Sequence, residues 1–411
     1  MHARPALRWS IGASLGIAAL LVDARAQETR PGSAADGAPA TQGESAASER
    51  TSPTTEGTGA PAAGVQPLAE SGWLTLGLMR VRDMTPFGLN RLDMLPAHAV
   101  KATPGTFAFE FNLSYQNTWA ISNNVKDYLE ARGIERGAIT GTDVTNILAL
   151  PGDAYLVDGE FGLLDLTLHH RLSSHWGLYA TIPFYFFEGG FLDSTIESFH
   201  DTVGFSNAGR EFVTRDSFTG IANLRGTGTQ IVITAKPDND FGDPVLGARY
   251  SLKDVPKTWN MIFEAAVKVP RSDEERLVST GEADYGAQVS SQWFFDRNAL
   301  YLTLAGVYYA SPEPGLASDM WIPTVIGGWE TRITEHLNFI LQVYASESTV
   351  QETNLDELSA NKLQATLGLQ WLYRGAALRF GLTENLANFS NTPDVGLTLS
   401  VGKVFYGGRT R

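Results

Sequence analysis

The chain has 411 residues, of which 18% are charged and 10% aromatic, with 41 glycines and no cysteine. This balance is typical of a strand-rich chain with many tight turns, and the missing cysteine excludes disulfides, thiolate metal sites and a cysteine nucleophile. A formal net charge of −14, without any run of Lys and Arg, argues against nucleic acid as a partner.

The N-terminus is predicted to be a cleaved secretory signal, residues 1–26. Arg4 and Arg8 precede an apolar run from Trp9 to Val22, and Ala24 and Ala26 supply the small residues that a signal peptidase requires. The alternative is a membrane anchor, but the run is shorter than the roughly 20 residues of a spanning helix. The sequence therefore indicates an exported protein.

Two further segments precede the main domain. Residues 27–70 consist almost entirely of Ala, Gly, Ser, Thr, Pro and Glu, so we expect a disordered low-complexity linker. Residues 71–105 show no clear periodicity. We interpret them as an N-terminal segment that either stays in the periplasm or plugs the main domain.

A long strand is predicted at residues 106–121. Large apolar residues occupy every second position and small or polar residues lie between them: Phe107, Phe109, Phe111, Leu113 and Tyr115 alternate with Ala108, Glu110, Asn112 and Ser114. Successive side chains of a strand point to opposite faces, whereas a helix would scatter these aromatic residues around its circumference. The run is far longer than the five or six residues typical of globular sheets.

The same alternation recurs through the rest of the chain. It is clear at 260–269, 285–295 and 362–373, and less regular at 160–172, 176–188, 228–236, 243–252, 299–310, 320–333, 337–348, 376–389 and 394–406. These lengths match transmembrane β-strands, and aromatic residues recur near strand ends, as the two membrane interfaces require.

The connections alternate in length. Short ones at Ser173–His175, Asp254–Lys257, Asp296–Asn298, Thr334–His336 and Arg374–Gly375 are predicted to be periplasmic turns. Longer ones, at about 123–158, 189–209, 270–283, 311–319 and 349–361, are predicted to face outward. The alternation is consistent only if a further strand lies within 210–219, which brings the total to fourteen and both termini into the periplasm. Bacterial single-chain barrels have an even number of strands.

The sequence thus predicts an all-β fold, a transmembrane antiparallel β-barrel of about 14 strands, with between about 12 and 16 allowed. It would span residues 106–406, leave a tail at 407–411, and lie in the outer membrane of a Gram-negative bacterium. The last strand ends with Phe405 and Tyr406, placed much as in the recognition signal of such barrels, although five residues follow. Outer-membrane lipid and the barrel assembly machinery are the expected partners. A soluble β-sandwich or lipocalin-like barrel, with its apolar face inward, is the alternative.

In such a barrel the polar face of each strand lines the lumen. The candidates for lumen lining and selectivity are Glu110, Gln116, Glu264, Lys268, Gln292 and Lys362. Both signs of charge are present, which is compatible with a solvated channel, a plugged interior held by ion pairs, or a narrow ligand path. No cofactor and no metal are predicted.

The connection 189–211 concentrates charge among apolar residues. Asp193, Glu197 and His200 would share one face of a short helix, since positions i, i+4 and i+7 are neighbours there. One interpretation is a catalytic cluster at the barrel mouth, with a metal or with His200 as general base. The other is a loop that folds inward as a constriction and pairs its own charges, adding Asp193, Glu197, His200, Arg210 and Glu211 to the lumen candidates.

Four stretches carry a resemblance to a known family: "RDMTPF" (82–87), "LPAHA" (95–99), "GGFLDSTIESFH" (189–200) and "AGRE" (208–211). Over roughly residues 80–406 the chain resembles the domain-of-unknown-function 3187 family. The resemblance implies an outer-membrane barrel and no established activity. The stretch "FGDPVLGARYSL" (241–252) is similar to strand openings of the aromatic-catabolism and fatty acid channel families, which implies a channel for small or hydrophobic compounds.

Functional hypotheses of different classes remain open. The first is a passive outer-membrane channel or transporter for small or hydrophobic solutes. The second is an enzyme that modifies lipid or lipopolysaccharide, with a site around His200. The third is a structural or interaction barrel. Whether the protein is an enzyme is undecided at this stage, and the sequence favours the channel.

Overall fold

The computed structural model describes residues 77–405, except 98–103, 205, 227, 253–257, 272–276, 311–319, 351–352, 354, 388–391 and 393. The described residues all belong to one compact unit, Thr75–Arg411. The predicted signal, linker and C-terminal tail, the turn at Asp254–Lys257 and the connection 311–319 lie outside the described residues.

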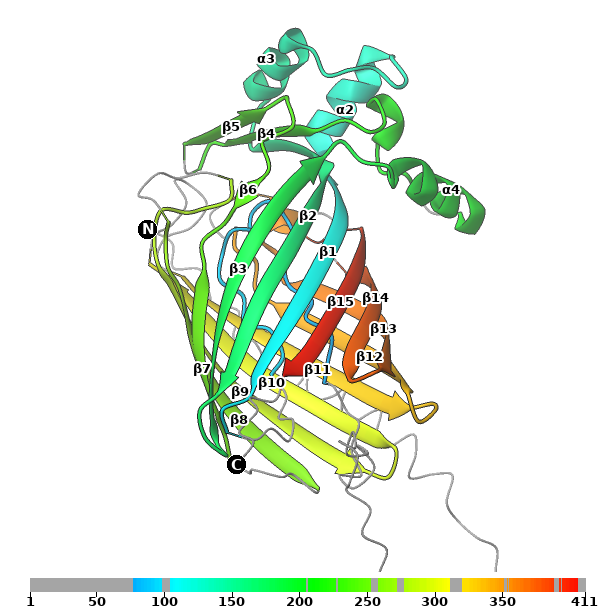
Figure 1. Cartoon of the computed structure of the whole chain (residues 1–411). Coiled ribbons are helices and arrows are strands. Elements are labelled where there is room, and N and C mark those ends of the chain that lie inside the picture. Colours follow the sequence, from blue (N-terminus) through cyan, green and yellow to red (C-terminus); the bar gives the residue numbers. More distant parts are fainter. Residues whose placement is uncertain are drawn as a thin grey trace, which may run out of the picture. The chain divides into compact units, whose positions relative to one another are not determined.

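Within the described residues, twelve antiparallel strands close into a barrel, because β2 pairs with both β1 and β3 (Figure 1). The barrel strands are β1 (Phe107–Ile121), β2 (Ala154–Arg171), β3 (Trp176–Glu188), β7 (Val245–Ser251), β8 (Trp259–Lys268), β9 (Asp284–Phe295), β10 (Asn298–Tyr309), β11 (Met320–Arg332), β12 (Leu337–Ser346), β13 (Lys362–Tyr373), β14 (Ala376–Ala387) and β15 (Val395–Phe405). The closing pair is β1 with β15, in which Phe107 lies opposite Phe405. The predicted closed antiparallel barrel is confirmed.

The strand number differs from the fourteen of the sequence-based scheme. Residues 210–212 form a 3₁₀ helix, η2 (Arg210–Phe212), and not a barrel strand. The predicted strand at 228–236 is β5 (Thr229–Ile233), which pairs with β4 (Thr219–Leu224) outside the ring. The β4–β5 hairpin forms outside the ring because β2 is longer than β3. The β2–β3 ladder ends at Glu160, and the remaining free edge of β2 pairs with β4. The two-residue β6 (Asp240–Phe241) also pairs with β3 outside the ring.

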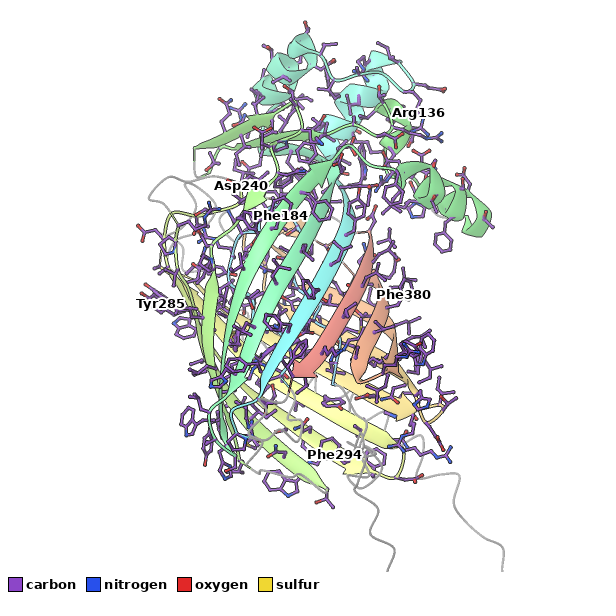
Figure 2. All side chains as sticks on the ribbon, viewed as in Figure 1. Arg136, Phe184, Asp240, Tyr285, Phe294 and Phe380 are labelled. Carbon is purple, nitrogen blue, oxygen red and sulfur yellow. The ribbon has the colours of Figure 1, made fainter. Side chains whose placement is uncertain are left out.

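Side chains alternate across the barrel wall as the sequence predicts. On β1, Phe107, Phe109 and Phe111 are 41–49% exposed, whereas Asn112 and Gln116 are 2% and 1% exposed. Other strands repeat the pattern, and Figure 2 shows Tyr285 and Phe380 projecting from the outside of the wall. An apolar exterior and a polar interior reverse the arrangement of a soluble β-sandwich or lipocalin-like barrel, which excludes that alternative.

Aromatic residues gather near both ends of this apolar exterior. Near the short turns, Trp176 packs on Tyr250 with ring centroids 5.0 Å apart, and Phe109 packs on Phe405. Near the other end, Tyr115 stacks on Phe186 and Phe191. From Trp176 to Phe186, β3 rises about 33 Å, which corresponds to a height of about 25 Å at a tilt of about 40° and matches an outer-membrane apolar band.

A cap of helices and the β4–β5 hairpin lies at the end of the barrel opposite the short turns (Figure 1). Its helices are α2 (Asn123–Arg132), α3 (Gly141–Ala149) and α4 (Asp193–Val203), and α5 (Asp356–Ser359) follows β12. The α3 helix begins with a reciprocal capping box between Thr140 and Asp143. The hydrophobic core of the cap contains Trp119 of β1, Val125 and Leu129 of α2, and Ile147 of α3. No helix among the described residues is long and apolar enough to cross a membrane.

Candidate functional site

The barrel interior is occupied by residues 77–97, which we call the lumenal segment. At its start, Gln370 of β13 donates a hydrogen bond of 2.8 Å to the Gly77 carbonyl. The chain then reaches a turn at 85–91, and its second half runs along β9, where Gln288 donates a 2.8 Å hydrogen bond to the Leu95 carbonyl. Since Gln288 and Gln370 are both on the inward face, the segment lies inside the barrel.

Ion pairs hold the first half of the lumenal segment to the wall. Arg80 lies 3.3 Å from Glu110 of β1, and Arg379 of β14 donates a 3.0 Å hydrogen bond to the same carboxylate. Further along, Asp83 pairs with Lys362 of β13. These groups are all largely buried, so each charge needs its partner to offset the loss of water.

The second half of the lumenal segment is held by a cluster of four charges, Arg91, Asp243, Lys268 and Asp284. Asp284 of β9 is fully buried and lies 2.9 Å from Lys268 of β8 and 3.7 Å from Arg91 of the segment. Asp284 also accepts a 2.9 Å hydrogen bond from the Leu92 backbone N–H, and Lys268 donates to the Asn90 carbonyl at 3.0 Å. A cavity of about 30 Å³ beside this cluster has room for only one or two waters.

Glycines on the inner wall make room for the lumenal segment. A Cβ added at Gly328 would lie 2.4 Å from the Leu78 side chain, and one at Gly368 would lie 3.0 Å from Met79 Cγ. At Gly286, it would lie 2.4 Å from Met94 Sδ and 3.0 Å from Met94 Cγ. Glycine inside a strand often marks a place where another chain segment approaches closely, and these positions fit that description.

The turn of the lumenal segment packs in apolar surroundings. Met84 and Leu89 belong to one buried hydrophobic cluster with Phe161 and Leu163 of β2 and with Tyr185 and Phe187 of β3. Phe87 joins a second cluster with Tyr155, Leu224, Val350 and Leu358. The lumen is therefore polar near Gly77 and partly apolar near the turn.

The structure brings four charged candidates of the sequence analysis to the inner wall, each with an opposite charge. Glu110 pairs with Arg80 and Arg379, Lys268 with Asp284, and Lys362 with Asp83. Glu264 pairs with Arg249 and accepts a 2.7 Å hydrogen bond from Tyr179. Gln116 and Gln292 also face inward and are each 1% exposed. Their role in selectivity stays a prediction.

Sequence reasoning missed the residues that these candidates contact. Arg80, Asp83 and Arg91 belong to a segment without periodicity, and Asp284 and Arg379 were not singled out from their strands. The charges of this segment were the available signal. Positive and negative residues lie close together within 80–93, and such a segment can form ion pairs with an inner wall that carries both signs of charge.

Asp193 and Arg210 of the 189–211 connection were predicted for the lumen, but the structure places them outside it. Arg210 donates to Asp193 at 3.0 Å and to Asn117 at 2.7 Å, and it also pairs with Asp394. Asn117 shares the outward face of β1 with Tyr115, since the β1 ladders run without a bulge. The register, which turns odd-numbered residues of β1 outward, is the reason for this correction.

Glu197 belongs to the same cap. It accepts hydrogen bonds from Arg136 at 2.6 Å and from Arg215 at 2.8 Å, and Figure 2 marks Arg136 in this region. Burial alone would raise the pKa of the Glu197 carboxyl, but the two guanidinium groups outweigh burial and lower that pKa. Glu211, in η2, accepts a hydrogen bond from the Arg136 backbone N–H through its carbonyl.

His200 lies on α4, so the predicted helix is confirmed. Its Nδ1 atom is 3.2 Å from the Asn207 side-chain oxygen. The two neighbouring carboxylates on this helix, Asp193 and Glu197, are each engaged by arginine. In the described part of the chain, no group of three or more His, Asp or Glu side chains is arranged to hold a metal ion.

Comparisons with known proteins give one family match. The model of the family described as "Protein of unknown function (DUF3187)" matches residues 129–405, more than half of the chain. The match begins after the stretches 82–87 and 95–99 and includes 189–200 and 208–211. No curated protein sequence matches this chain.

Solved outer-membrane barrels resemble the fold at low identity. The COG4313 outer membrane channel from Pseudomonas putida F1 is 12% identical with a TM-score of 0.46, over 76% of this chain and 100% of that one. The P. putida toluene transporter TodX is 9% identical with a TM-score of 0.35, over 74% and 92%. The Ralstonia pickettii toluene transporter TbuX is 11% identical with a TM-score of 0.34, over 74% and 90%. These scores are too low to support an argument about function.

Proposed function

The chain belongs to the DUF3187 family of proteins of unknown function, and from its geometry we propose that it is an outer-membrane channel or transporter whose lumen is closed by residues 77–97. The observation that carries the proposal is a segment of the chain itself, held inside a closed barrel by ion pairs and hydrogen bonds to strands β1, β8, β9 and β13. Solute passage then requires this segment to move.

The apolar exterior supports a place in the membrane. Exposed large apolar side chains occur on strands all around the barrel, among them Phe111, Trp176, Phe263, Leu304 and Leu367, each 42–53% exposed. In water such a surface would drive aggregation, whereas lipid is its natural solvent. The short turns and both ends of the barrel chain would face the periplasm, and the helical cap would face outward. Barrel assembly machinery is the partner that such a fold requires.

A small hydrophobic solute is the proposed cargo. If the lumenal segment moves, Met84 and Leu89 leave the rings of Phe161, Tyr185 and Phe187, which then form an apolar surface inside the barrel. Apolar surface exposed inside a channel favours an apolar or partly apolar solute over an ion. The alternative of a lipid-modifying enzyme has less support, because Asp193 and Glu197 are engaged by arginine and are not free for proton transfer.

A reversible disulfide lock tests the proposal. Met79→Cys together with Gly368→Cys would place one sulfur near the present Met79 Cγ, 3.0 Å from the other Cβ, which matches disulfide geometry. The native chain has no cysteine to compete. In proteoliposomes, we expect the oxidised double variant to block solute entry and its reduction to restore entry. Each single-cysteine variant should admit solute equally under oxidising and reducing conditions. Equal entry in the oxidised and reduced states would refute a gate at residues 77–97.

A further inference from the structure

The inner wall near the turn of the lumenal segment has two kinds of surface at the same height. Across the β1–β2 ladder, Ser114 lies opposite Leu163 and Gln116 opposite Phe161. Beyond β2, these apolar residues lie opposite Tyr185 and Phe187 of β3. The border between polar and apolar wall thus runs between β1 and β2.

On the other side of β1 the wall stays polar. Gln116 of β1 lies opposite Gly396 of β15. The cross-strand pairs then continue around the wall through Thr383 of β14 and Thr366 of β13 to Gln342 of β12. One inward position away on β13 and β15 lie Gln364 and Thr398. We call Gln116, Gln342, Gln364, Thr366, Thr383 and Thr398 the amide strip. It contains only uncharged hydrogen-bonding side chains.

Polar atoms of the amide strip are buried without a hydrogen-bond partner among the described residues. Gln342 and Gln364 lack partners at both the amide nitrogen and the amide oxygen, Gln116 at its oxygen and Thr398 at its hydroxyl. Each of the four is 1% exposed. Buried polar groups are almost always hydrogen-bonded, so a cluster of unpartnered ones indicates that something other than the protein bonds to them.

Other glutamines of the inner wall behave differently. Gln288 and Gln370 donate hydrogen bonds of 2.8 Å to backbone carbonyls of the lumenal segment, at Leu95 and Gly77. Those two hold the segment in place. The glutamines of the amide strip make no such hydrogen bond to the described residues of the segment, although each is 1% exposed. Their donors and acceptors are therefore available to a different molecule once the segment moves.

We propose that the lumen binds a small uncharged amphiphile, with its apolar body against Phe161 and Phe187 and a hydroxyl or carbonyl group on the amide strip. This inference rests on the proposed channel function and narrows its solute class. The apolar body replaces Met84 and Leu89, and the polar group supplies the missing partners. An ion is disfavoured, because the strip is neutral and Lys362, the charged residue next to it on the inward face of β13, is already paired with Asp83.

Photolabelling tests this solute class on the full chain in nanodiscs. The probes are two diazirines of equal chain length, one an aliphatic alcohol and the other the plain alkane, and labelled residues are mapped by mass spectrometry. We expect the alcohol to label inward residues around Phe161 and Phe187. We expect the alkane to label mainly the outward apolar residues. The oxidised lock between positions 79 and 368 should abolish the inward labelling.

Variants separate the amide strip from a general loss of polarity. The combined substitutions Gln116→Leu, Gln342→Leu and Gln364→Leu should lower inward labelling by the alcohol about tenfold, the loss expected for one good hydrogen bond. Ser290→Ala is the control, because Ser290 is also a buried polar residue of the inner wall but lies on β9, outside the strip, where it bonds to Thr303. It should leave the labelling unchanged.

The outcomes distinguish this inference from the proposed function. Equal inward labelling by alcohol and alkane, no inward labelling by either, or an unchanged signal in the triple variant would overturn the amphiphile site. Solute entry that responds to the redox lock would still support the channel in each of those cases. Conversely, specific inward labelling by the alcohol without solute entry would support a binding site and contradict the proposed channel function.

Discussion

The side-chain amide of Gln370 donates a 2.8 Å hydrogen bond to the carbonyl of Gly77, which precedes it by 293 positions in the chain. This bond and its counterpart from Gln288 to Leu95 connect the wall to the two ends of the lumenal segment. These two bonds to backbone carbonyls add to the ion pairs that the side chains of Arg80, Asp83 and Arg91 make with the wall. The wall itself is then the part to alter.

Replacing both Gln288 and Gln370 by Leu should loosen the lumenal segment without breaking the barrel. Each of these hydrogen bonds stabilises the closed state by about 1 kcal/mol. Neither bond exists after the segment has moved, so the substitutions destabilise only the closed state. We expect more frequent openings in planar-bilayer recordings. The Ser290→Ala variant, which removes an inward hydroxyl that bonds to Thr303 of the wall, should behave like the native chain. Unaltered opening in the double variant would argue against these anchors.

Asp284→Asn should release the segment more strongly. Asp284 pairs with Lys268 and Arg91, so its neutralisation leaves Lys268 with Asp243 alone and removes the ion pair of Arg91 with the wall, at a cost of about 3–5 kcal/mol. We predict a marked rise in open probability, with the folded barrel retained as judged by its far-ultraviolet circular dichroism. Glu188→Gln is a suitable control, since the Glu188 pair with Lys236 is exposed. A closed, stable D284N barrel would contradict the role of this cluster.

Phe111→Arg tests the orientation of the wall. Phe111 is 49% exposed in the middle of the outward row of β1, and an arginine facing the centre of a bilayer destabilises outer-membrane barrels by about 2–4 kcal/mol. Urea unfolding in lipid vesicles, followed by tryptophan fluorescence, should show this loss. Phe199→Arg, on the exposed side of α4 and outside the barrel strands, should change stability much less. Equal effects would speak against lipid at position 111.

The cap should weaken in acid. The pKa of Glu197 in the folded chain is lower than the usual value of about 4.3. A lowered pKa stabilises the fold fully above the usual value, and this contribution disappears as pH falls through the folded pKa. Hydrogen exchange of α4 should therefore accelerate at acidic pH below 4.3, and Glu197→Gln should remove most of this dependence. Arg215→Gln should weaken the cap at neutral pH, because Glu197 loses one of its two cations.

The strands were the most predictable part of the molecule. The alternation of apolar and polar residues at Phe107–Tyr115 and Leu363–Tyr373 predicts a strand, because only an extended chain places the apolar and the polar side chains on opposite faces. The amphipathic spacing of Asp193, Glu197 and His200 likewise predicted α4. What failed was local: "REFVTRDSFT" has strand-like composition, but β2 extends past its neighbour and pairs with the following residues 219–224 instead.

The site was less predictable, because it depends on contacts between distant residues. Periodicity places Glu110 and Lys362 on an inner face, but it does not say that Arg80 and Asp83 lie opposite them. The lumenal segment has no regular structure of its own, so no repeat marks it. The glycines at 286, 328 and 368 were visible in the sequence, yet their meaning appears only when Met79 and Met94 are seen against them.

The most direct test is the ionic current through single barrels in planar bilayers, with and without residues 77–95. The full chain should be closed for most of the recording, whereas the shortened chain should conduct steadily, because its lumen has lost the segment that fills it. If the two conduct alike, or if the shortened barrel folds and still passes no ions, the lumenal segment does not close the pore and the account is wrong.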